Sequence, residues 1–238
     1  AYTDGGGIDN QTGGTLTLQS CTVSGNYARG GTGGGVYNQA GGTLTLENCT
    51  LSGNSAGTGG AIYDSGGTAT LENTIIANNY KGSGASTADD VSGGIVSGNY
   101  NLIESLGGAT ITGVVSQNIS GQDPNLSSLG DYGGPTRCHL PLSGSPVIDA
   151  IPNGTNGMGS GSLNVDQRSI TRPYNGAGDM GAVESRPFLT TTTATNITST
   201  TAGAGGNIIT DGGAAITARG VAWNTTGSPT TEFTQKTN

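Results

Sequence analysis

The chain has 238 residues, of which 46 are glycine, 5% are aromatic and 10% are charged. This much glycine without a G-X-Y period excludes collagen, and regularly spaced Leu, Ile and Val exclude a disordered chain. The net charge of −8 and a total of only 8 Lys and Arg residues leave no basic stripe, which argues against nucleic acid as a partner. No apolar run reaches the roughly 18 residues of a membrane-spanning helix.

One sequence motif occurs three times near the start of the chain, as GGTLTLQSC, GGTLTLENC and GGTATLENT. Leu16 and Leu44 are 28 residues apart, and Leu44 and Ala69 are 25 apart. A period in the twenties, with short alternating runs between glycine turns, is typical of a solenoid. Each copy holds three strand-like pieces and lacks the pattern of a leucine-rich repeat. We therefore expect an all-β fold, a parallel β-helix with three strands per coil, over residues 5–80.

Stacked coils place equivalent residues directly above one another, about 4.8 Å apart. Alternation along each strand sends the apolar residues inward and the threonines outward. The predicted internal ladders are Leu16/Leu44/Ala69, Leu18/Leu46/Leu71 and Val23/Leu51/Ile76.

Asparagine recurs at two predicted bends of each coil, since Asn tolerates a left-handed backbone and stacked Asn amides hydrogen-bond along a ladder. These bends are Ser20/Asn48/Asn73 and Asn26/Asn54/Asn79, and a third corner falls at the glycine pairs 13–14, 41–42 and 66–67. Looser coils are expected in DDVSGGIVSGNYNLIES and in ATITGVVSQNIS.

The repeat GGTLTL-x-N-C-T-[IVL]-S-G-N resembles bacterial surface β-helices of the polymorphic outer-membrane-protein repeat type. Downstream, DPNL, GGPT, SPVIDA, DQR and DMGAVE follow in an order that resembles the C-terminal signature of choice-of-anchor Q proteins. Together these motifs cover residues 5–187. The resemblance implies an exported, surface-associated or secreted right-handed β-helix without an established enzymatic activity. Gly178 stands where the family often has a cysteine.

Three regions are expected: coils over residues 1–122, a closing region over 123–187, and a β segment over 188–238. The last resembles the opening of a fibronectin-like sandwich repeat, with TARGVAW as a central strand and Trp223 as its core aromatic. A sandwich of this kind has about 100 residues, so about half would be present. Both ends are then open, which leaves two alternatives: a trimmed fragment, or a fibre subunit completed by its neighbours through strand addition.

No convincing catalytic constellation is found. Asp89 and Asp90 are expected in a solvated loop, although they are the carboxylates that an acid–base enzyme acting on polysaccharides would use. His139 is the single histidine and is expected to be a packed structural residue. GAGDMG at 176–181 fits GxGxxG but lacks the βαβ context of a dinucleotide site.

Other charged residues and the cysteines are assigned structural roles. Glu47 and Glu72 stack on adjacent coils, but two carboxylates make only a weak calcium site, so no metal or cofactor is predicted. Cys21 and Cys49 are expected as stacked free thiols, and the three cysteines have no metal-binding spacing. The residues expected to form ion pairs and hydrogen bonds that close the end of the helix are Asp149, Asp166, Arg168, Asp179 and Glu184.

Two outward features are candidates for contact with a glycan or a surface. Tyr37 lies over Tyr63 in the predicted stack, where an aromatic pair either binds a sugar ring or stabilises adjacent coils. The threonine files are Thr15/Thr43/Thr68 and Thr17/Thr45/Thr70. Such T-x-T files occur in ice-binding solenoids, but Thr is also a common exposed strand residue.

The sequence thus favours a non-catalytic structural or adhesive β-helix, extracellular or on the cell surface, that self-associates or binds a surface or glycan partner. The alternative is a carbohydrate-active β-helix, either a lyase or hydrolase or a glycan-binding module.

Overall fold

The computed structural model describes residues 4–82, 87–113, 116–155, 164–174, 176–213 and 215–223. All regular structure in these ranges is β-strand, and none of the described segments has the helical length and hydropathy needed to cross a bilayer. The chain forms two compact units, Ala1–Ser185 and Arg186–Asn238. The boundary expected between residues 187 and 188 falls close to this division.

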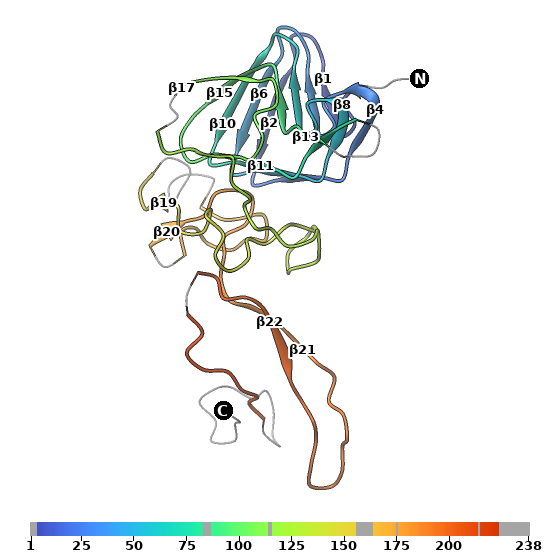
Figure 1. The fold of residues 1–238 in the computed structure, drawn as a ribbon. Helices are drawn as coiled ribbons and strands as arrows, with labels where there is room; N and C mark the ends of the chain where they lie inside the picture. The colour runs from blue at the N-terminus through green and yellow to red at the C-terminus, as the bar shows by residue number, and fades with distance from the viewer. Residues whose placement is uncertain are drawn as a thin grey trace. The chain divides into compact units, whose positions relative to one another are not determined.

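The first unit is a parallel β-helix whose coils run through four sheets (Figure 1). Sheet A contains β1 (Ile8–Asn10), β5 (Val36–Asn38), β9 (Ile62–Asp64) and β14 (Val91–Ser92). Sheet B contains β2 (Thr15–Gln19), β6 (Thr43–Glu47), β10 (Thr68–Glu72), β15 (Gly94–Ser97) and β17 (Thr110–Gly113). Sheet C contains β3 (Thr22–Ser24), β7 (Thr50–Ser52), β11 (Ile75–Ala77), β16 (Leu102–Ile103) and β18 (Ile119–Ser120). Sheet D contains β4 (Tyr27–Thr32), β8 (Ser55–Thr58), β12 (Tyr80–Lys81) and, antiparallel to β12, β13 (Thr87–Ala88).

The parallel β-helix is confirmed, but the expectation of three strands per coil was one strand short. The additional strands are those of sheet D, whose sequences YARGGT, SAGT and YK contain few large apolar residues. In β4 and β8 an inward position is filled by alanine, and both Ala28 and Ala56 are buried. The signal for this sheet was therefore a small residue alternating with polar ones.

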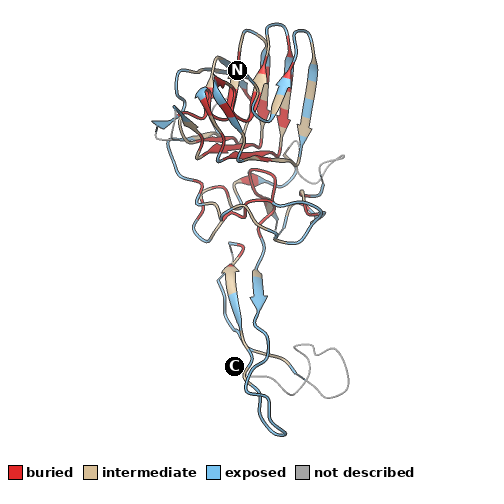
Figure 2. Ribbon diagram, turned by 90° about the vertical axis from the view of Figure 1, so that its right-hand side faces the viewer, coloured by how far each residue is buried: buried red, intermediate tan, exposed pale blue. Residues whose placement is uncertain are grey.

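The predicted internal ladders are confirmed in register. Leu18 pairs with Leu46 and Leu46 with Leu71, and all positions of β2, β6 and β10 follow the same alignment. The two looser coils continue the stack, since Ala69 pairs with Ile95 and Ile95 with Ile111. In Figure 2 the buried residues of the coils lie on the strands that surround this core.

Each corner of the coil uses a residue with positive φ at the same place in successive repeats. Such a backbone suits Gly and Asn, which carry little steric penalty there. The bend at Ser20, Asn48 and Asn73 is confirmed, with φ of 47°, 51° and 52°. At the next corner the positive values belong to the residues before the predicted ones, namely Gly25, Gly53 and Asn78. The other two corners carry Gly13/Gly41/Gly66 and Gly5/Gly33/Gly59.

Asn26, Asn54 and Asn79 instead supply a side-chain ladder. Asn26 Nδ2 donates to Asn54 Oδ1 at 2.9 Å, and Asn54 Nδ2 donates to Asn79 Oδ1 at 2.9 Å. The chain of donors ends at Asp90, whose Oδ1 accepts from Asn79 Nδ2 at 2.8 Å. A carboxylate is a suitable last member because it accepts on both oxygens and donates from neither.

A second ladder of this kind was not predicted from the sequence. Asn10 Nδ2 donates to Asn38 Oδ1 at 2.7 Å, and Asn38 Nδ2 donates to Asp64 Oδ1 at 2.6 Å. It too ends in an aspartate. The available signal was the recurrence of Asn or Asp at the third residue of β1, β5 and β9.

The described residues of the range 123–185 (123–155, 164–174 and 176–185), called the lateral region below, pack along the outer face of sheet C rather than across the end of the helix. Gln167 contacts Thr22 on the first coil, and Ala182 N–H donates to Thr50 Oγ1 at 3.0 Å on the second. Apolar residues complete the contact in one cluster that contains Ile75, Ala77, Leu102, Val147, Ile151 and Met180. The expectation that this region closes the helix end is therefore corrected.

The physical reason lies in sheet C itself. All three residues of β11, Ile-Ile-Ala, are apolar and buried, as a strand covered on both faces requires. Within the lateral region, β19 (Ile151–Pro152) and β20 (Ala177–Gly178) form a short antiparallel pair.

The second unit contains one antiparallel pair in its described residues, β21 (Phe188–Thr191) and β22 (Gly206–Thr210). The predicted strand TARGVAW is not formed, because only residue 222 makes an isolated bridge there. Trp223 is 50% exposed, so its predicted role as a core aromatic is wrong in this structure. The described residues of this unit form only this two-stranded sheet, so they offer no second sheet against which the side chain can pack.

Candidate interaction surface

The outer face of sheet B is a regular array of threonine side chains. Thr15 pairs with Thr43 and Thr43 with Thr68, and the second file aligns Thr17, Thr45 and Thr70 in the same way. The array extends beyond the two predicted threonine files, because β17 adds Thr110 and Thr112. Gly94 and Val96 interrupt it on β15. The first residue of each Thr-x-Thr pair is exposed, as in the eBiBi burial pattern of β6 and β10.

The two predicted tyrosines lie side by side on the outer face of sheet A. The ring centroids of Tyr37 and Tyr63 are 5.7 Å apart, and the rings are tilted by 44°. Both side chains are half-buried. This geometry falls in the range of favourable aromatic pairs, so it stabilises adjacent coils while leaving part of each ring open to solvent.

An acidic row borders the threonine array at the end of its strands. Gln19 Nε2 donates to Glu47 Oε2 at 2.7 Å, and Glu47 pairs in register with Glu72. Burial, followed by repulsion from Glu47, raises the pKa of Glu72 against the effect of a backbone bond from Asn99. Within the described residues, no group of three His, Cys, Asp or Glu side chains is arranged to hold a metal ion.

Asp89 and Asp90 are buried, which corrects the expectation of a solvated loop. Asp89 Oδ2 accepts from Gly59 N–H at 2.9 Å, and Asp90 Oδ2 accepts from Ser105 N–H at 2.7 Å. Burial raises the pKa of Asp90 to about 7, although Asn79 and Ser105 donate to it. These carboxylates hold the Asn ladder and the neighbouring backbone and are shielded from solvent.

The charged residues of the lateral region form a buried network. Arg168 Nη2 lies 2.9 Å from Asp166 Oδ2, and Arg172 Nη1 lies 3.4 Å from Glu184 Oε2. Asp179 Oδ1 accepts from Asp149 N–H at 2.7 Å. The predicted pairing of these residues is thus present, but it holds the lateral region together instead of closing the helix end. Arg172, fully buried, was missed from the sequence.

Burial dominates the electrostatics of this network. It raises the pKa of Asp179 to about 6 and that of Glu184 to about 7, and the charge of Asp179 adds to the shift of Glu184. Burial likewise lowers the pKa of Arg172, opposed by the nearby carboxylates.

His139 joins the lateral region to the first coil. Its Nδ1–H donates to Ser127 O at 2.7 Å, which leaves Nε2 to accept from Ser24 Oγ–H at 2.9 Å. His139 is 8% exposed, and burial lowers its pKa. The packed structural role expected of His139 is thus present, whereas its partner Ser24 lies in no motif that could have identified it.

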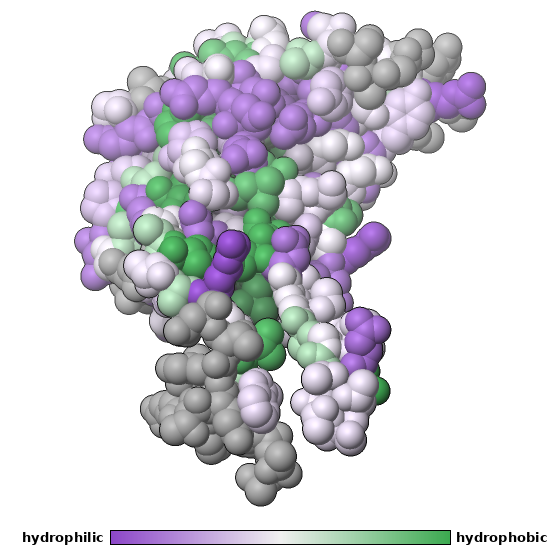
Figure 3. All heavy atoms as spheres, turned by 60° about the horizontal axis from the view of Figure 1, so that its bottom comes forward, coloured by the Kyte–Doolittle hydropathy of each residue, from purple (hydrophilic) through white to green (hydrophobic). Residues whose placement is uncertain are grey.

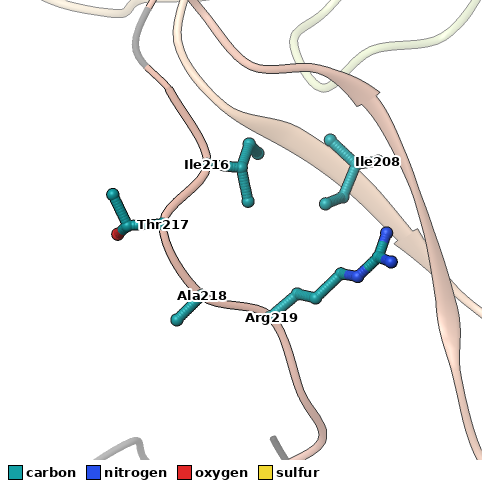
Figure 4. A pocket seen from close by; sticks show the side chains of 5 residues that line it. All are labelled: Ile208, Ile216, Thr217, Ala218 and Arg219. Carbon is teal, nitrogen blue, oxygen red and sulfur yellow. The ribbon is translucent and has the colours of Figure 1, made fainter.

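The pockets in the described residues include one in each unit. A pocket of about 160 Å³ lies beside the last coils, where its lining includes Ile103, Ile111 and Ile119. The other, of about 740 Å³, lies in the second unit (Figure 4), where Ile216 and Arg219 point toward β22 and Thr217 and Ala218 point away. In the view of Figure 3, hydrophobic residues show mainly as narrow strips between hydrophilic and neutral ones.

The three cysteines are free: Cys21 is half-buried, whereas Cys49 and Cys138 are buried. GAGDMG at 176–181 contains β20, and no helix follows it in the described residues. Comparison with family models, with curated proteins and with solved structures finds no match to this chain.

Proposed function

We propose that the chain is a non-catalytic structural and adhesive module that works at the cell surface or outside the cell. The observation that carries this proposal is the five-stranded outer face of sheet B, with its in-register threonine files. The ladders beneath it fix the spacing of these side chains. A rigid, uncharged array of hydroxyl and methyl groups suits contact with an extended, repetitive surface such as a polysaccharide.

Three further observations support a non-catalytic role, export and a glycan ligand. The candidate acid–base pair, Asp89 and Asp90, is buried and hydrogen-bonded to the backbone. The resemblance of the repeat to bacterial surface β-helices favours export. Tyr37 and Tyr63 favour a glycan as the ligand, because half-exposed aromatic rings stack on the apolar faces of sugars.

The test is binding of the labelled full chain to immobilised neutral and acidic polysaccharides. We expect the double variant Thr45→Lys/Thr70→Lys to bind at least about tenfold more weakly, because two lysine charges in the middle of the uncharged threonine array disrupt its contact with a neutral ligand. The matched control is Thr190→Lys/Thr192→Lys, on exposed residues of the second unit. Equal binding by both variants would remove sheet B from the proposal, and cleavage of a polysaccharide by the wild type would contradict its non-catalytic part.

Head-to-tail self-association is the second part of the proposal. The inner residues of the first coil, Leu16 and Leu18, are half-buried, whereas Leu44 and Leu46 of the second are fully buried. Edge strands with apolar neighbours recruit further strands. Sedimentation and electron microscopy across a concentration series should show filaments, and a strictly monomeric species throughout would exclude them.

A further inference from the structure

Cys21 and Cys49 occupy the same position in the first two coils. Cys21 directly precedes β3 and Cys49 directly precedes β7, and Thr50 N–H donates to Cys21 O at 2.9 Å. Parallel neighbours of this kind are about 4.8 Å apart, within the roughly 4.4–6.8 Å window of Cα separations in disulfides.

The two thiols lie in different surroundings at this corner. Cys21 Sγ is 3.0 Å from Gln19 O and half-buried, whereas Cys49 Sγ is 3.3 Å from Leu18 O and buried. A hydrogen bond from the Cys49 thiol lowers the pKa of Cys21 to about 6, while burial raises that of Cys49. The more accessible sulfur, Cys21, thus has the lower pKa of the two, so it reaches its thiolate form at a lower pH than Cys49 does.

We propose that Cys21 and Cys49 form a site of thiol–disulfide exchange that reacts with small aliphatic disulfides from solution. The Cys21 thiolate attacks one sulfur of the small disulfide, forms a mixed disulfide and releases one small thiolate. Cys49 then loses its proton and attacks Cys21 Sγ, which releases the second small thiolate. The two cysteines are oxidised to a bond between the first and second coils, and the small disulfide is reduced to two thiols.

The geometry also favours reduction of the disulfide back to two thiols. In-register side chains hold their Cβ atoms about 4.8 Å apart, wider than the usual separation of about 3.8 Å in a disulfide. Closing the bond strains the corner, and strained disulfides are readily reduced. The pair is thus suited to reversible joining of two coils.

The experiment treats the reduced full chain with oxidised glutathione near neutral pH and maps the products by intact mass and peptide mass spectrometry. We expect a Cys21–Cys49 disulfide with loss of two hydrogen atoms, reversed by a dithiol. Recovery of unmodified chain, or of a stable glutathione adduct on the wild type, would overturn the proposal.

Single variants separate the two roles. Cys49→Ser should stop at a glutathione adduct on Cys21, and Cys21→Ser should react on the order of tenfold more slowly. Cys138→Ser is the matched control, because Cys138 is buried elsewhere and burial raises its pKa, so this variant should react as the wild type does.

A second measurement needs no variant: the rate of the wild-type reaction should level off above the pKa of Cys21, about 6. A rate that keeps rising toward the pKa of an ordinary thiol, about 8.5, would contradict the assignment of Cys21 as the attacking group.

Discussion

The coils and the lateral region bury polar side chains in two different ways. In the coils each buried amide meets an equivalent group one coil later, as in Asn26–Asn54–Asn79, and the chain of donors ends on Asp90. In the lateral region each buried charge meets an unlike partner, as in the pair of Arg172 and Glu184. A ladder distributes its hydrogen bonds over several equivalent rungs, whereas an ion pair depends on a single partner.

The outer faces of sheets B and C show the same contrast. β6 alternates exposed and buried residues, whereas all three residues of β7 are buried beneath the lateral region. One face is therefore available to an outside partner, and the other is used to fix a second layer of the protein.

The largest effect is expected for Arg172→Met, because the variant leaves Glu184 buried without its cation. Losing one member of a buried ion pair costs about 3–5 kcal/mol, which urea unfolding of the full chain would measure. Arg137→Met is the matched control on an exposed arginine and should change stability by less than about 0.5 kcal/mol. Similar losses in both variants would contradict the role of the network.

The next effect is expected for Asn54→Ala, in the middle of its ladder. The variant removes the bonds to Val23 O and Asn79 Oδ1, and also the acceptor of Asn26. We expect a loss of about 3 kcal/mol, since buried groups left unsatisfied cost about 1–3 kcal/mol each. Asn26→Ala, at the half-buried first rung, should cost about 1 kcal/mol in the same measurement. A reversed order would show that the ladder does not carry the stability assigned to it.

The stability of the wild type and that of Asp90→Asn should depend differently on pH, because the Asp90 carboxylate titrates and an amide does not. Burial raises its pKa from 3.8 to about 7, so the folded chain binds this proton more tightly than the unfolded chain does. The resulting stabilisation is present below 3.8 and is lost as pH rises through about 7.

We therefore expect the free energy of unfolding of the wild type, relative to that of Asp90→Asn, to fall as pH rises from about 4 to about 7, by on the order of 4 kcal/mol. His139 acts in the opposite direction below 6.5, because its pKa is lowered, but this contribution cancels between the two proteins. If this difference in stability does not change with pH, the pKa of Asp90 is not raised by folding, which would contradict its assigned place in the ladder.

The smallest effect compares two threonines of the second coil. Thr50→Val removes the acceptor of Ala182 N–H on the covered face and should cost about 1 kcal/mol. Thr45→Val on the outer face of sheet B should change stability by less than about 0.5 kcal/mol. Thermal unfolding of both variants measures the difference, and equal values would argue against the covering of sheet C.

The repeat made most of the coil predictable, because a fixed period determines both register and side-chain direction. Leu18, Leu46 and Leu71 were placed correctly for this reason. The strands of sheet D were not predicted, because alanine and glycine contribute little to a hydrophobic pattern. The burial of Asp89 and Asp90 was not predicted, because each accepts a hydrogen bond from a residue outside its own sequence segment, namely Gly59 or Asn79.

The lateral region shows the limit of sequence reasoning most clearly. Its charged residues were recognised as partners, yet the surface that they support could not be identified from spacing alone. The apolar run Ile75-Ile76-Ala77 was the available signal, since consecutive apolar residues in a strand indicate cover on both faces.

The most direct test of the lateral packing is disulfide cross-linking across it. Thr50 Oγ1 and Ala182 N are 3.0 Å apart, so the double variant Thr50→Cys/Ala182→Cys should form an intramolecular disulfide under mild oxidation, located by peptide mass spectrometry. Thr112→Cys/Ala182→Cys, which pairs the same residue with the last strand of sheet B, should not. A cross-link in the second variant and none in the first would place residues 123–185 over the end of the helix and contradict the structure described above.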